Sequence, residues 1–141
     1  MDHRLATRAV ALRLVFGATA ALAGLDKFFN ILADWSTYTS PLAEQLLPVS
    51  AEVFMRIVGV IELGVGIAIL AAAPVLGAYI ASAWLLLVAA NLVLAGRFDI
   101  AARDVVMSVA AFTLARLLEL RHESPASSAV GEHSRRTAVV Q

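Results

Sequence analysis

The residues with the clearest chemical potential are ionisable side chains that lie inside or beside long apolar segments. Asp26 and Lys27 form a charged doublet at the end of an apolar stretch, and Lys27 is the only lysine in the chain. An unpaired charge in a lipid environment is costly, so such groups either mark the membrane surface or pair with one another. Later segments supply further polar side chains, namely Arg56, Glu62, Asn91, Asp99, Arg103 and Asp104.

With Arg97 included, four basic groups balance four acidic groups in these segments, which predicts mutual pairing if they are buried. We expect Asp26 or Lys27 to pair with Arg103 or Asp104, because each doublet offers both signs of charge. The groups of this candidate polar pocket are Glu62, Arg56, Asp26, Lys27, Asn91, Arg103 and Asp104.

Glu62 is the strongest functional candidate, because a carboxyl deep inside an apolar helix is hard to explain as a surface anchor. With Arg56 one to two helical turns outward, it could bind a quinone head group or a small anion between the two side chains. The alternative is that the whole cluster is structural, serving only to join helices or to anchor them at the interface.

Composition favours a membrane protein. The 141 residues are 60% hydrophobic and 16% charged, and the mean hydropathy is +0.82, whereas a soluble domain has about a quarter of its residues charged. Zero net charge offers no electrostatic basis for nucleic-acid binding. The absence of cysteine excludes disulfides and thiolate metal sites. All three histidines lie outside the apolar segments, which excludes a histidine-held haem between helices, and we expect no metal site.

The hydropathy pattern predicts an all-α protein, a four-helix transmembrane bundle. The stretch from residue 63 to residue 96 is uncharged and too long for one span of about 20 residues, and Pro74 supplies the break. The fourth segment is the weakest, because its uncharged part, 105–115, is short enough for an interfacial helix instead. The expected helices cover about 10–32, 52–72, 75–96 and 99–120.

The connection 33–51 contains no lysine or arginine, whereas both ends of the chain are rich in arginine. Positive charge favours the cytoplasmic side, so we expect both termini in the cytoplasm and residues 121–141 to form a disordered cytoplasmic tail. Trp35 and Tyr38 suit an interfacial belt. Pro41 is expected to begin a short helix, and Ser50 to cap the next one. The alternative for the first segment is a signal peptide cleaved before Gly24.

Three motifs follow one another along the chain: Arg13–Gly17 with Gly24–Phe28, then Gly59–Gly64, then Asp99–Asp104. Together they resemble the DoxX family of small four-helix integral membrane proteins of bacteria. The resemblance covers roughly residues 9–118 and implies a location in the bacterial plasma membrane. Related DoxD proteins are subunits of a thiosulfate:quinone oxidoreductase, so it also implies an association with redox metabolism. It supplies no catalytic motif that maps onto this chain residue by residue.

Two functional hypotheses stay open at this point. In the first, the chain is a quinone-linked redox subunit or membrane anchor of an oxidoreductase complex, with quinone as its cofactor. In the second, it is a non-catalytic membrane scaffold or assembly protein whose buried ion pairs are structural. The partners to expect are the lipid bilayer, peripheral oxidoreductase subunits and further copies of the chain.

Overall fold

The structure is a computed structural model that describes the backbone of residues 3–46 and 48–139, and the side chains of residues 6–46 and 48–121. Within these ranges the chain is all-helical and contains no strand. The elements are α1 (His3–Asp26), η1 (Trp35–Tyr38), α2 (Pro41–Leu46), α3 (Ala51–Ile67), η2 (Ala68–Ala72), α4 (Pro74–Leu94) and α5 (Phe98–Val139).

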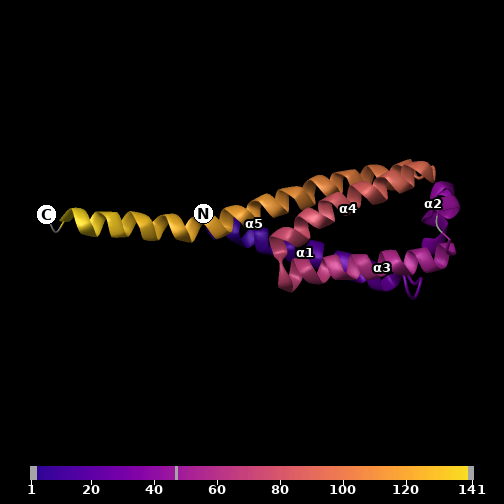
Figure 1. Cartoon of the computed structure of the whole chain (residues 1–141), viewed down its shortest axis with the longest axis horizontal. Coiled ribbons are helices and arrows are strands. Elements are labelled where there is room, and N and C mark those ends of the chain that lie inside the picture. The colour runs from indigo at the N-terminus through magenta and orange to yellow at the C-terminus, as the bar shows by residue number, and fades with distance from the viewer. Residues whose placement is uncertain (1–2, 47, 140–141) are drawn as a thin grey trace.

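The long helices form two antiparallel pairs. Helix α1 packs against α3, and α4 packs against α5. The pairs meet near the start of α1 and diverge toward the end where α2 lies (Figure 1). The apolar core accordingly lies where the two pairs meet. At the α2 end, the pairs must therefore be joined by other contacts than those of the core. The core residues are Ala9, Phe16, Val65, Ile69, Ala78, Ala81, Ala111, Leu114, Ala115 and Leu118.

Helices α1 and α3 approach backbone to backbone because glycine faces glycine. A Cβ added to Gly59 would lie 2.7 Å from the carbonyl oxygen of Gly24, and one added to Gly24 would lie 2.6 Å from the carbonyl oxygen of Gly59. Small residues of this kind allow close helix packing in membranes. The α1–α3 pair therefore depends on the absence of side chains at these two positions.

The break between α3 and α4 lies where proline predicts it. The five residues of η2 form a π-helix that ends at Ala73, whose backbone (φ −151°, ψ 75°) is not helical, and Pro74 begins α4. Arg13 of α1 donates from Nε to the carbonyl of Ile69 (2.8 Å) and from Nη2 to that of Leu70 (2.5 Å). These carbonyl groups lie in the last turn before Pro74, where the helix ends and no following backbone N–H bonds them. Arg13 therefore caps the end of η2 from a neighbouring helix.

Among the described residues, three helical stretches are long and apolar enough to cross a membrane, and they indicate a multi-pass membrane protein: Ala6–Asp26, Ala51–Ala72 and Pro74–Leu94. The second and third agree with the predicted segments. The first ends earlier than the expected residue 32. The chain turns there because the Asp26 carboxylate accepts the backbone N–H groups of Ile31 and Leu32, and Asn30 adopts a left-handed conformation (φ 52°). The predicted short helix at Pro41 and the Ser50 cap, which accepts from Val53 N, are confirmed.

Helix α5 differs from the prediction in length. Its uncharged stretch 105–115 is bounded by charges on both sides, so it is not among the three apolar helices. The helix then continues to Val139, past the other helices (Figure 1), where we expected a tail without regular structure. Extending a helix that is already formed adds a hydrogen bond for each residue fixed, which makes propagation much easier than nucleation.

Candidate functional site

The central feature of the candidate site is an ion pair between the end of α1 and the middle of α3. Lys27 Nζ donates to Glu62 Oε2 at 2.6 Å, and the two side chains are 5% and 15% exposed. The ammonium group also lies 3.9 Å from the ring centroid of Trp35, within the range of a cation–π contact. Both charges are therefore neutralised inside the protein rather than by a ligand.

Asp26 completes a group that we term the Lys27 network: Asp26, Lys27, Trp35 and Glu62. The Asp26 carboxylate accepts the indole N–H of Trp35 at 2.7 Å, in addition to the backbone N–H groups of the turn after α1. Asp26 is buried, and these bonds satisfy it. Its role is to hold the turn and the loop against the end of α1.

Trp35 begins a segment, residues 35–40, that joins the two helix pairs and that we term the strap. At its other end, Asn91 of α4 accepts the backbone N–H of Ser40 (3.1 Å) and donates to the carbonyl of Tyr38 (2.9 Å). Arg97, in the turn between α4 and α5, lies 5.3 Å from the Tyr38 ring. Asn91 therefore fixes the strap rather than contributing to a ligand pocket. We expected Trp35 and Tyr38 only as belt residues, so sequence reasoning missed these contacts.

Arg103 and Asp104 pair with each other, so the predicted pairing of Asp26 or Lys27 with this doublet is wrong. The Asp104 carboxylate accepts from Nε (3.1 Å) and Nη2 (3.0 Å) of Arg103. Asp104 is buried, while the Arg103 side chain is 67% exposed. The physical reason is the divergence of the helix pairs at this end, which places α5 with α4 and away from α1 (Figure 1).

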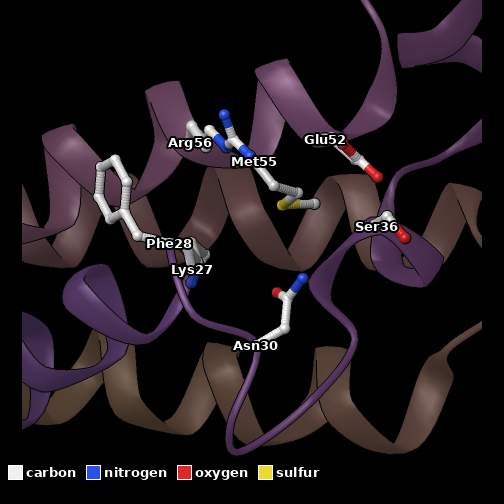
Figure 2. A pocket seen from close by; sticks show the side chains of 7 residues that line it. All are labelled: Lys27, Phe28, Asn30, Ser36, Glu52, Met55 and Arg56. Atoms are coloured by element: carbon white, nitrogen blue, oxygen red, sulfur yellow. The ribbon is translucent and has the colours of Figure 1, made fainter.

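Glu62 and Arg56, which were predicted to hold a ligand between them, do not line the same hollow. Positions six apart lie on different faces of a helix, and Glu62 turns toward Lys27. Arg56 instead lines a hollow of about 100 Å³ at the start of α3, which Glu62 does not line (Figure 2). Glu52, which we had not singled out, also lines it; the signal was its position one helical turn before Arg56. The other lining residues are Lys27, Phe28, Asn30, Ser36 and Met55.

The predicted polar residues thus gather at the α2 end of the molecule but in separate groups rather than in one pocket. Within the residues that the structure describes, no cluster of three or more histidines and carboxylates could hold a metal ion. The arrangement can join helices and hold the strap. At the hollow beside α3 it leaves Glu52 and Arg56 without an ion pair to any residue that the structure describes.

A scan against protein-family models, a search of curated proteins and a search of solved structures found no match to this chain. The resemblance to the DoxX family therefore stays a prediction, based on the motifs given above.

Proposed function

We propose that the chain is a four-span, DoxX-like subunit that anchors or holds together a membrane-bound oxidoreductase complex in the bacterial plasma membrane. In this proposal the first half of α5 is the fourth span. Between the exposed charges Arg103 and Arg116, large apolar side chains are exposed, including Val106, Val109 and Phe112, whereas Asp104 and Ser108 are buried. Ser108 donates to the carbonyl of Ser82 on α4 at 2.8 Å, which satisfies a polar group on the packed face.

The observation that carries the proposal is the closed Lys27–Glu62 ion pair. Glu62 was the best candidate for proton exchange with a bound quinone, and such a role requires a carboxyl that faces the ligand. Instead, its oxygen is 2.6 Å from the Lys27 ammonium group, and Lys27 is covered by Trp35. This arrangement favours a structural role for the charges, as in the membrane anchor of the first hypothesis or the scaffold of the second. A quinone-linked redox subunit is the alternative.

Purification of the protein from its native membrane in mild detergent tests the proposal. We expect other membrane or peripheral subunits to co-purify and to be identified by mass spectrometry. The Glu62→Gln variant should lower the melting temperature without selectively removing any bound quinone. Loss of bound quinone with an unchanged melting temperature would favour the redox alternative, and a chain that purifies alone from gently solubilised membranes would contradict the anchor role.

A further inference from the structure

The hollow beside α3 has hydrogen-bond donors on one side and acceptors on the other. Figure 2 shows Glu52 and Ser36 near each other on one side, and Arg56 and Lys27 on the opposite side. The Asn30 side chain reaches into the space between them from the turn after α1 (Figure 2). A ligand with one anionic end and one cationic end would match this distribution.

The groups needed for such a ligand are available. Arg56 and Glu52 are exposed, and neither side chain forms a hydrogen bond or ion pair with any residue that the structure describes. The Lys27 ammonium group is already held in its ion pair, so Arg56 is the available cation. The Ser36 hydroxyl donates its hydrogen to Asp34 (2.6 Å), which leaves its oxygen free to accept.

The spacing of the two charges restricts the ligand. Glu52 and Arg56 are four residues apart on α3, so their Cβ atoms are about 6 Å apart on the same helical face. A phosphate and an amine joined by a two-carbon linker can bridge that separation. In this arrangement the phosphate oxygens accept from Arg56 and Asn30, and the ammonium group donates to Glu52 and Ser36.

The hollow also lies at the depth of lipid head groups. It is formed just beyond Asp26, where the first candidate span ends, and at the start of the second, which begins at Ala51. Apolar side chains are exposed here too: Phe28 lines the hollow, and Val53 and Ile57 directly follow Glu52 and Arg56 in α3. Acyl chains could lie along these residues while the head group occupies the polar space.

From these features we propose that the hollow binds the head group of a phospholipid with a primary amine, a phosphoethanolamine lipid of the surrounding bilayer. The inference goes beyond the proposed function and does not depend on it, because it requires only that the helices cross a membrane. A phosphocholine head group has a quaternary ammonium that cannot donate a hydrogen bond to Glu52. A phosphoglycerol head group has no cation at all.

Binding of defined lipids to the full-length protein tests this site. The protein is stripped of lipid in detergent and titrated with phosphatidylethanolamine, phosphatidylcholine and phosphatidylglycerol of identical acyl chains, with native mass spectrometry as the readout. We expect phosphatidylethanolamine to bind about tenfold more tightly than phosphatidylcholine, the effect of one charge-assisted hydrogen bond. Glu52→Gln should abolish that preference. Arg56→Gln should weaken the binding of all three lipids, whereas Arg56→Lys should retain most of it.

Two control variants change the same charges outside the hollow. Glu44 in α2 and Arg8 in α1 are both exposed, so Glu44→Gln and Arg8→Gln should preserve the lipid preference of the wild type. The melting temperature of each variant shows whether it is folded. Equal binding of phosphatidylethanolamine and phosphatidylcholine by the wild type would overturn the proposal, as would equal losses in the control variants. Binding of soluble phosphoethanolamine as tightly as the lipid would overturn the assignment to the bilayer.

Discussion

At the scale of single residues, Lys27 determines the arrangement of the candidate site. Its ammonium group is buried, so it requires a close acceptor, and Glu62 supplies one at 2.6 Å from the neighbouring helix. The sequence predicted that these charges must be paired, because the free-energy cost of an unpaired charge depends only on whether it is buried in an apolar environment. It did not predict the partner, because that depends on how the helices are arranged and not on charge or depth.

A double-mutant cycle on this pair measures the coupling. Removing one partner leaves the other as a buried, unpaired charge, so Lys27→Met or Glu62→Gln alone should destabilise the protein by about 3 kcal/mol or more. We expect Lys27→Met to be the worse of the two, because after Glu62→Gln the ammonium group still contacts Trp35. The double variant should lose less than the sum of the single losses. Thermal or denaturant unfolding in detergent gives all four values.

The ion pair between Arg116 and Glu119 in α5 is the natural control. Both of its side chains are more exposed (59% and 31%) than those of the Lys27–Glu62 pair. Because solvent screens the attraction between these two charges, Arg116→Gln and Glu119→Gln should change the melting temperature only slightly. Additive losses for Lys27 and Glu62, or effects as small as those of the control pair, would contradict the buried ion pair.

At the scale of helices, the contact between α1 and α3 rests on backbone atoms rather than on large side chains. Gly59 touches the backbone of Gly24, and a Cβ at Gly66 would lie 2.6 Å from the backbone nitrogen of Ala21. Gly64 lies in the same helix, yet a Cβ there would meet no atom within 4 Å. The three positions carry the same residue type but differ in how closely the neighbouring helix approaches them. The sequence alone therefore does not show which glycine is needed for packing.

Substitution of two glycines by alanine should therefore change stability in opposite directions. Gly59→Ala forces α1 and α3 apart and should cost about 1–3 kcal/mol, which exceeds the gain in helix propensity. Gly64→Ala meets open space, so it should stabilise α3 by up to about 1 kcal/mol. Melting temperatures of the two variants in the same detergent provide the measurement. No loss for Gly59→Ala, or an equally large loss for Gly64→Ala, would show that the glycine contact does not hold these helices together.

Helix positions were also the best-predicted part of the fold. The helix start at Pro41 and the break at Pro74 follow from the chemistry of proline, and the cap at Ser50 satisfies a backbone N–H at a helix start. The cap that Arg13 supplies from another helix was not predicted. The end of α1 was placed too late because the apolar run continues through Phe28 and beyond. The turn there depends on hydrogen bonds from the following loop to Asp26, which hydropathy does not register.

At the scale of the whole molecule, the two helix pairs are joined by different means at their two ends. Apolar side chains join them where α1 begins, and the strap joins them where they diverge. The strap holds α1 through Trp35 and α4 through Asn91. Separation of the pairs at this end would therefore require the loss of specific polar contacts, a feature that no single segment of the sequence indicates.

The number of membrane crossings is the remaining property of the whole molecule, and it depends on α5. In the part of the chain that the structure describes, three helices satisfy the length and hydropathy requirements of a span. The charges around 105–115 exclude α5 by composition, but Asp104 is buried in contact with Arg103, and the exposed residues Val106 and Val109 are apolar. We therefore expect α5 to cross the membrane, which would place the segment after it on the opposite side from the strap.

Cysteine labelling distinguishes four crossings from three, because the chain contains no cysteine of its own. Single cysteines are introduced by Glu44→Cys in α2, Arg8→Cys in α1 and Arg121→Cys in α5, all at exposed positions. A membrane-impermeant maleimide should label the first variant in intact cells and the other two only after permeabilisation. With three crossings, Arg121→Cys would instead be labelled in intact cells together with Glu44→Cys, since the two positions would lie on the same side. Labelling of Arg8→Cys in intact cells would show that the N-terminus lies outside the cell. That orientation is the opposite of the one that the distribution of arginine along the chain predicts.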